Sequence, residues 1–146
     1  MIGLDATTLI AFEIKEHPIH SQVRKGIREE LAMGERFALC DQTGWEFLHI
    51  VTDARRFDTP LDMEEALVRL NRWSSAAEVV YLPSTLEARE WVLRWMKEFA
   101  LGRKRILDTA LAATFHVHGI RRVATANPAD FSCFEIFEFE PWARLP

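Results

Sequence analysis

The chain has little cysteine and no long apolar run. Its 146 residues include two cysteines, Cys40 and Cys133, which lie far apart and in no metal-binding spacing. We therefore expect reduced thiols in the core rather than a disulfide. No segment approaches the ~18 apolar residues of a membrane span, and the first residues lack the basic start of a secretory signal. These absences predict a cytoplasmic protein with no membrane partner.

Positive charge is also scarce. The 18 Lys and Arg residues are outnumbered by 22 Asp and Glu residues, for a net charge of −4, which argues against a general basic coat for nucleic acid. The basic residues gather instead in three clusters, at Arg55-Arg56, Arg103-Lys104-Arg105 and Arg121-Arg122. Taken alone, each cluster is typical of a solvated helix or loop end.

Size and composition indicate one soluble domain. The chain is 49% hydrophobic and 27% charged, which is ordinary for a globular protein. A length of 146 residues lies within the usual range of one domain with one core, and no repeat or linker divides it. We therefore expect residues 1–146 to form a single domain.

Apolar patterning predicts alternating strands and helices. Short apolar runs indicate strands at Ile2–Leu4, Phe37–Cys40, Glu78–Leu82 and Arg122–Thr125, with an alternating edge strand at Glu135–Phe139. Helical spacing and capping residues indicate helices from about Thr7, from Pro18 to Met33, around Trp45 to Thr52, from Asp62 to Ser75, from an N-cap at Ser84 to Gly102, and from Asp108 to His118. Within the third helix we expect Trp45, Leu48 and Val51 on one apolar face, beside a polar stripe with Glu46 and His49.

This alternation predicts an α/β fold, with a mainly parallel sheet and helices on both faces. In such a sheet the carboxyl ends of all strands lie along the same edge. Asp5 ends one strand, Asp108 begins a helix after a loop, and Asp130 follows another strand. These side chains can therefore meet although they are distant in sequence.

Several carboxylates in one cleft repel each other, and the usual remedy is a hard divalent cation with oxygen ligands. Mg²⁺ or Mn²⁺ would suit such a site. These ions can activate a water and bridge phosphate oxygens, which is the chemistry of metal-dependent nucleases. Nearby arginines would then hold backbone phosphates.

Each acid also has a purely structural interpretation. Asp108 is a good helix N-cap, Asp130 could form a turn after Asn127-Pro128, and Glu46 could lie on a wet helix face. Asp5 is harder to explain in this way, because it directly follows a buried strand, where an unpaired charge is costly. The histidine pairs His116/His118 and His17/His20 have the wrong spacing for a metal site, and we expect them to be structural.

Over nearly its whole length the chain resembles the PIN-domain ribonucleases, and among them the VapC-like toxins of toxin–antitoxin pairs. Five segments carry the resemblance: Leu4–Ile10, His17–His20, Trp45–Phe47 with the loop to Phe57, Asp108–Ala113 with His118-Gly119, and Thr125–Phe131. The third of these is similar to the family's second acidic motif, and the fourth is the most specific match.

The resemblance implies a PIN-like three-layer α/β/α fold and a metal-dependent endoribonuclease. It implies that Asp5, Glu46, Asp108 and Asp130 surround Mg²⁺ or Mn²⁺, assisted by Thr125 and Asn127. Family members differ in whether the asparagine-like position or the later acid faces the metal, so Asn127 and Asp130 are alternatives for the last ligand. Arg103, Lys104 and Arg105 are candidate RNA contacts. The implied partners are an RNA substrate, a cognate antitoxin and a second copy of the chain in a homodimer.

Two other functions are compatible with the sequence. One is a PIN-fold module that has lost catalysis and binds RNA or protein. The other is a phosphatase or phosphoacceptor using Asp5, but the haloacid-dehalogenase pattern requires a second aspartate where this chain has Thr7. The sequence leaves open which RNA is cleaved, how many ions bind, and whether the nuclease is a toxin or a housekeeping enzyme.

Overall fold

A computed structural model describes residues 1–146. Its five strands are β1 (Ile2–Leu4), β2 (Phe37–Cys40), β3 (Val79–Leu82), β4 (Arg122–Ala124) and β5 (Glu138–Phe139). Its six α-helices are α1 (Ala6–Glu13), α2 (His20–Ala32), α3 (Asp41–Val51), α4 (Met63–Ser75), α5 (Leu86–Glu98) and α6 (Ile106–Val117). Four short 3₁₀ helices complete it: η1 (Arg103–Arg105), η2 (Pro128–Asp130), η3 (Ser132–Phe134) and η4 (Pro141–Ala143).

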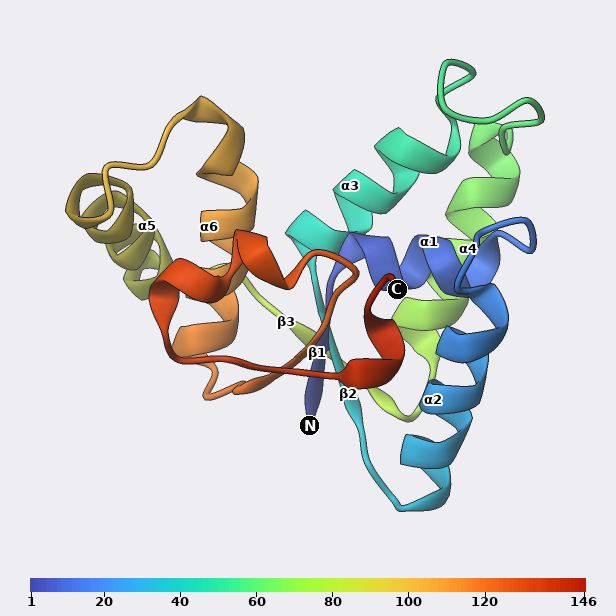
Figure 1. Cartoon of the computed structure of the whole chain (residues 1–146), viewed down its shortest axis with the longest axis horizontal. Helices are drawn as coiled ribbons and strands as arrows, with labels where there is room; N and C mark the ends of the chain where they lie inside the picture. Colours follow the sequence, from blue (N-terminus) through green and yellow to red (C-terminus); the bar gives the residue numbers. More distant parts are fainter.

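The strands form one sheet in the order β3-β2-β1-β4-β5, and every neighbouring pair is parallel. The helices α1 to α4 lie on one side of the sheet and α5 and α6 on the other (Figure 1). This arrangement confirms the predicted α/β/α fold with a parallel central sheet. It also places β1 in the middle, with its carboxyl end between the two helical layers.

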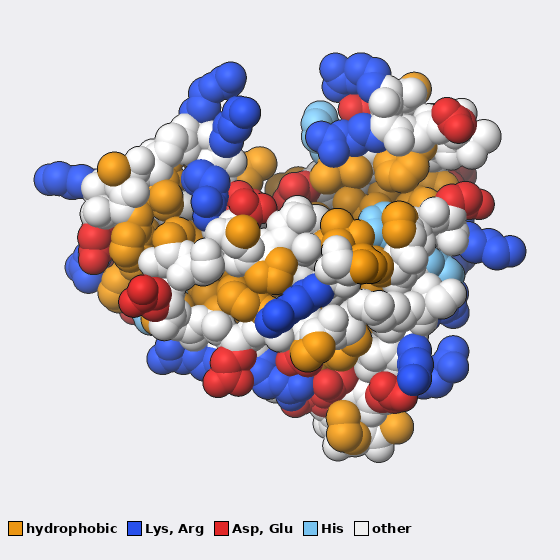
Figure 2. Space-filling model, in the orientation of Figure 1, with side chains coloured by type: hydrophobic (Ala, Val, Ile, Leu, Met, Phe, Trp, Pro, Cys, Tyr) orange, Lys and Arg blue, Asp and Glu red, His pale blue; other side chains and the backbone are white.

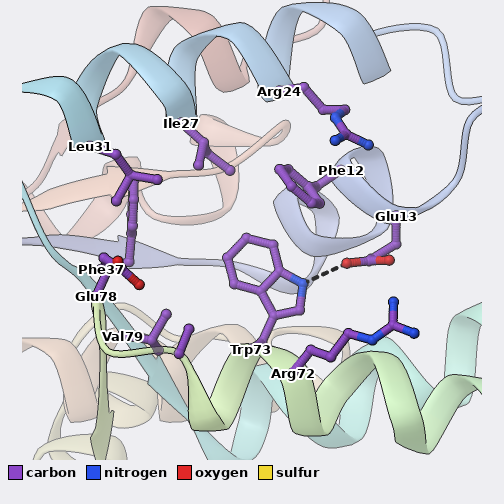
Figure 3. Close-up of a pocket in the computed structure, with 11 residues that line it drawn as sticks. Phe12, Glu13, Arg24, Ile27, Leu31, Phe37, Arg72, Trp73, Glu78 and Val79 are labelled. Carbon is purple, nitrogen blue, oxygen red and sulfur yellow. Dashed lines mark hydrogen bonds between the residues drawn. The ribbon is translucent and has the colours of Figure 1, made fainter.

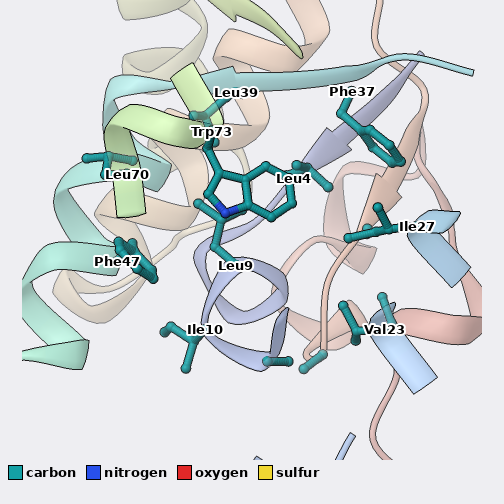
Figure 4. Close-up of a cluster of buried hydrophobic side chains, with 14 of the residues drawn as sticks. Leu4, Leu9, Ile10, Val23, Ile27, Phe37, Leu39, Phe47, Leu70 and Trp73 are labelled. Atoms are coloured by element: carbon teal, nitrogen blue, oxygen red, sulfur yellow. The ribbon is translucent and has the colours of Figure 1, made fainter. Parts of the chain in front are cut away.

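Successive side chains of each strand point to opposite faces of the sheet, and an apolar core lies on each face. Ile2 and Leu4 of β1 join a cluster with α1 to α4, which is shown in Figure 4. Ala38 and Cys40 of β2 point to the other face, where they pack with α5, α6 and Phe134 of η3. Burial on both faces explains why these strands have continuous apolar sequences rather than an apolar and polar alternation.

The close contact between α6 and the sheet depends on Gly3. A Cβ atom at this position would lie 2.7 Å from the ring of Phe115, which is fully buried. Glycine is therefore required because α6 packs directly onto the backbone of β1.

The start of α5 and the extent of β5 differ from those expected. The cap of α5 is Thr85 rather than Ser84, because the Thr85 hydroxyl accepts the hydrogen bond from the Ala88 amide. The last strand contains Glu138 and Phe139 rather than Glu135–Phe139. The chain is still in the 3₁₀ helix η3 up to Phe134, and Glu135 then adopts a left-handed conformation with φ 54°. Pairing with β4 therefore begins only at Glu138.

Trp45 was expected on the apolar face of its helix, and this expectation was wrong. The buried face of α3 is formed by Phe47, Leu48 and Val51 with smaller neighbours, whereas Trp45 is 61% exposed. Small residues at the start of the helix, including Gly44 against Leu70, bring that face against α4 and turn the indole outward.

The histidines and cysteines have the structural roles expected of them. His20 bonds to the carbonyl of Ala11, and His116 packs against the rings of Trp91 and Trp95. Both cysteines are free thiols. No helix in the structure has the length and hydropathy needed to cross a membrane.

Arg122 is the first residue of β4 and binds three carboxylates at the amino ends of the strands, away from Asp5. Its guanidinium group donates to Glu140 at 2.7 Å, Glu35 at 2.8 Å and Glu30 at 3.0 Å. The side chains of Glu30 and Glu140 are only 10% and 8% exposed. One arginine therefore compensates carboxylates from α2, the following turn and the last strand region.

Candidate functional site

Asp5 lies at the carboxyl end of the central strand and is 5% exposed. Its Oδ1 atom accepts a hydrogen bond from the Ala6 amide at 2.7 Å, so the side chain caps α1. Its Oδ2 atom accepts from the hydroxyls of Thr7 at 2.8 Å and Thr125 at 2.7 Å. Burial raises the pKa of this carboxyl, although the three hydrogen bonds oppose the effect.

Thr7 and Thr125 join the Asp5 strand end to the segment after β4. The Thr7 hydroxyl accepts from the Ala126 amide, and the Thr125 hydroxyl accepts from the Asn127 amide, both at 3.0 Å. Thr125, expected to assist the acids, contacts one of them directly through its bond to Asp5. Asn127 contributes through its backbone, while its side chain is exposed and forms no capping bond.

Glu46 projects from the second turn of α3, beside the carboxyl end of β2. Burial, together with the negative charges of Asp5 and Asp108, raises its pKa to about 7. Arg56 opposes this shift from the loop after α3. Glu46 is therefore not simply a solvated residue on the helix surface, because the charges of the other acids affect its ionisation.

Asp108 is the third residue of α6 and not its N-cap. The helix begins at Ile106, and Arg105 precedes it without any side-chain cap. Burial and the charges of Asp130 and Asp5 raise the Asp108 pKa to about 6. The Nε atom of Arg105 lies 3.5 Å from Asp108 Oδ2, which moderates the shift. The capping interpretation of Asp108 was wrong.

Asp130 ends the short helix η2, after the turn that follows β4. Its backbone carbonyl accepts a hydrogen bond from the Arg105 guanidinium. Its carboxylate forms no hydrogen bond or ion pair within the chain, and its charge raises the pKa of Asp5, Glu46 and Asp108. The structure therefore brings all four sequence-predicted acids into one electrostatic neighbourhood, each from a different segment.

These acids offer the hard oxygen donors that Mg²⁺ and Mn²⁺ prefer. No three acidic, histidine or cysteine side chains lie close enough to hold one ion together. Mg²⁺ characteristically binds one or two carboxylates and keeps several waters, so a looser set suits it. The mutual repulsion, visible in the raised pKa values, is the property that a cation would relieve.

A notch opens between the two helical layers, on the side of the molecule where α3 and α6 face each other. Figure 2 shows a notch with acidic side chains at its floor and Lys and Arg side chains on both rims, in the orientation in which α3 and α6 flank it. A hollow of about 340 Å³ on the α3 side is lined by Trp45, Glu46, His49, Arg56 and Leu107, among others. A negatively charged chain could thus meet cations at the rims while reaching the carboxylates.

A second hollow, of about 370 Å³, lies between α2 and α4. Its wall includes Phe37 and Val79, the first residues of β2 and β3, so it opens at the opposite edge of the sheet from the acids. Trp73 donates to Glu13 across it at 2.8 Å (Figure 3). Its charged residues are two arginines and two glutamates, Arg24, Arg72, Glu13 and Glu78, and it contains none of the four acids. We therefore place the candidate chemistry in the notch.

Two residues of the site were not among those expected from the sequence. Thr7 bonds directly to Asp5, and its position two residues after that aspartate was the available signal. Arg56 lowers the pKa of Glu46 from the loop after α3, where its place in the Arg55-Arg56 cluster was the available signal. Both arginines of the doublet also pair with Asp53, Arg55 at 3.0 Å and Arg56 at 3.7 Å.

Comparisons with known proteins match the whole architecture. The model of the PIN domain family matches residues 2–132. Among curated proteins, no sequence matches the chain. The toxin VapC20 of Mycobacterium tuberculosis, described as cleaving the sarcin-ricin loop, is 16% identical with a TM-score of 0.74, over 97% of this chain and all of that one.

Two further solved structures are similar. VapBC2 of Rickettsia felis, bound to a DNA fragment from its promoter, is 16% identical with a TM-score of 0.67, over 96% of this chain and 98% of that one. FitAcB of Neisseria gonorrhoeae is 19% identical with a TM-score of 0.64, over 97% of this chain and 99% of that one. At these identities the likeness demonstrates the shared fold.

Proposed function

The chain belongs to the PIN domain family, and on that basis we propose that it is a metal-dependent endoribonuclease acting as the toxin of a toxin–antitoxin pair. The observation that carries the proposal is the set of four mutually coupled carboxylates at the carboxyl edge of the sheet. Asp5, Glu46, Asp108 and Asp130 are the residues that would hold Mg²⁺ or Mn²⁺.

A bound divalent ion would polarise the RNA phosphodiester and lower the pKa of a water molecule that attacks it. The chain's own residues prepare this chemistry. Thr7 and Thr125 hold the Asp5 carboxylate in one orientation, and the sheet fixes its distance from α3 and α6. Arg103 and Lys104 lie exposed at the start of α6, where they can bind the RNA backbone.

The similar structures support the choice of partners. VapC20 is described as a toxin that cleaves the sarcin-ricin loop, and VapBC2 and FitAcB are antitoxin complexes. We accordingly propose an RNA substrate, a cognate antitoxin and a homodimer for this chain. An RNA substrate of this class also implies that the protein acts in the cytoplasm.

The test is cleavage of end-labelled RNA by the purified chain with Mg²⁺ or Mn²⁺, compared with Asp5→Asn and Asp108→Asn. Each variant should reduce cleavage by ~100-fold or more while remaining folded, because each removes a charged oxygen donor. Asp41→Asn is the matched control, since Asp41 follows β2 but bonds to the Tyr81 hydroxyl at 2.7 Å outside the coupled set. It should retain cleavage.

Two results would contradict the proposal. RNA binding that persists in a chelator, with no cleavage under either ion, would show a PIN-fold binding module in place of a nuclease. Cleavage unchanged in both aspartate variants would refute the site.

A further inference from the structure

Arg105 differs from the other two residues of its basic cluster. Arg103 and Lys104 are exposed and take part in no ion pair or hydrogen bond through their side chains. The Arg105 side chain is 25% exposed and folds back toward the acids. Of the three candidate RNA contacts, Arg105 is therefore the one whose side chain is engaged within the chain.

The guanidinium of Arg105 links two of the acidic segments. Its Nε atom lies 3.5 Å from Asp108 Oδ2, and its Nη2 atom donates to the backbone carbonyl of Asp130. The Nε atom is buried and forms no hydrogen bond of its own, so the ion pair is what compensates it. One side chain thus ties the first turn of α6 to the end of η2.

Asp108 is the one acid of the four that forms an ion pair. Asp108 is paired with a cation within 4 Å, whereas Asp5 accepts hydrogen bonds from neutral groups, and Glu46 and Asp130 have no ion-pair partner in the structure. The positive charge therefore stands beside an oxygen that the proposed divalent ion would also need.

We propose that Arg105 is a positioning residue that serves as an internal counter-ion, holding Asp108 and the Asp130 turn in the metal-free protein and competing with the divalent cation for Asp108. This inference rests on the proposed function, because it assumes that the acids bind a cation. With a cation on Asp108, the Arg105 guanidinium would no longer be the counter-ion of that carboxylate and could bind an RNA phosphate beside the site.

The experiment is calorimetric titration of Mn²⁺ into the metal-free chain without RNA. Arg105→Ala should bind Mn²⁺ about threefold or more tightly than the unmodified chain, because a nearby positive charge no longer opposes the ion. Arg105→Lys, which keeps the charge, should stay nearer the unmodified affinity. Arg103→Ala is the matched control: its charge is exposed and screened, so the affinity should not change.

Thermal unfolding gives a second readout. Without metal, Arg105→Ala should melt below the unmodified chain, since the acids lose their counter-ion. Added Mn²⁺ should then raise its melting temperature by more than it raises that of the unmodified chain. If the alanine variant does not fold, Arg105→Gln, which keeps the length and a donor, carries the same two expectations.

Equal or weaker Mn²⁺ binding by the variants that lack the charge would overturn the inference and leave the nuclease proposal standing. Failure of every form, including the unmodified chain, to bind Mn²⁺ would overturn both. The two failures are therefore distinguishable in one set of titrations.

Discussion

The Thr125 hydroxyl donates to Asp5 Oδ2 at 2.7 Å, joining residues 120 positions apart in the chain. The bond favours the ionised carboxylate in a place where burial disfavours it. It also connects β1 to the segment that carries Asp130, so the geometry of the site depends on a neutral residue.

Replacing Thr125 with valine should weaken the proposed nuclease without unfolding it. The substitution keeps the shape but removes the donor, so the Asp5 pKa should rise further and the acidic limb of the pH–activity profile should move to higher pH. We expect a loss of ~10-fold at neutral pH, measured as RNA cleavage at saturating Mg²⁺.

Thr114→Val is the matched control, because Thr114 is equally buried and its hydroxyl bonds within α6 to the Ala110 carbonyl. Its profile should not move. A Thr125→Val profile with an unshifted acidic limb would contradict the assigned role.

The metal-free protein should become less stable as pH rises from about 4 to about 8. The folded-state pKa values of Glu46, about 7, and Asp108, about 6, lie above the ordinary values of 4.5 and 3.8. The folded protein therefore binds more protons than the unfolded chain in this range, and its free energy of unfolding falls with pH. Asp53, whose pKa is lowered to about 2, acts below this range. Burial lowers the pKa of His17 and His116, which opposes the trend and offsets part of the fall.

Chemical denaturation at a series of pH values in chelator measures this trend. Glu46→Gln should flatten the dependence, because a neutral amide cannot ionise, and Mn²⁺ should reverse the loss at high pH. Stability that rises between pH 5 and pH 8 in chelator would contradict the electrostatic account of the site.

Arg122→Ala should destabilise the fold without affecting metal binding. It leaves the buried carboxylates of Glu30 and Glu140 without their cation, at a cost of about 2–3 kcal/mol after discounting for the partial exposure of the arginine. Urea denaturation measures the change. Arg121→Ala is the control, since Arg121 is exposed and makes one long hydrogen bond of 3.4 Å.

Gly3→Ala should also destabilise, by about 1–3 kcal/mol, because the new methyl group meets the buried Phe115 ring. The double variant with Phe115→Leu should recover part of the loss if the clash is the cause. Gly102→Ala meets no atom within 4 Å and should cost little by comparison. Equal melting temperatures for Gly3→Ala and the unmodified chain would refute the close packing of α6 on β1.

Patterning in the sequence was sufficient to predict the number and type of the main elements. Continuous apolar strands alternating with amphipathic helices admit few arrangements other than a covered parallel sheet. The errors lie where local signals compete. Ser84 and Thr85 are both good caps, and the alternation of Glu135–Phe139 is overridden by a left-handed turn at Glu135.

The site was less predictable than the fold. Motif positions identified the four acids, but their type and spacing could not show that Asp108 lies inside its helix or that Asn127 contributes through its backbone. Arg105 was indistinguishable from Arg103 in a basic run. The direction of the Arg105 side chain depends on the packing of the start of α6 against η2, a tertiary contact that no local sequence pattern encodes.

The four carboxylates come from segments spread between Asp5 and Asp130, so the acidic site is incomplete on a growing chain until nearly all of it has been made. A ribosome-bound intermediate that has folded β1 to β3 already contains Asp5 and Glu46 but lacks both later acids. The chemistry proposed here should therefore appear late in synthesis, once β4 has inserted beside β1 and the turn after it has left the exit tunnel. An enzyme that acts on cellular RNA would in this way remain inactive during most of its own translation.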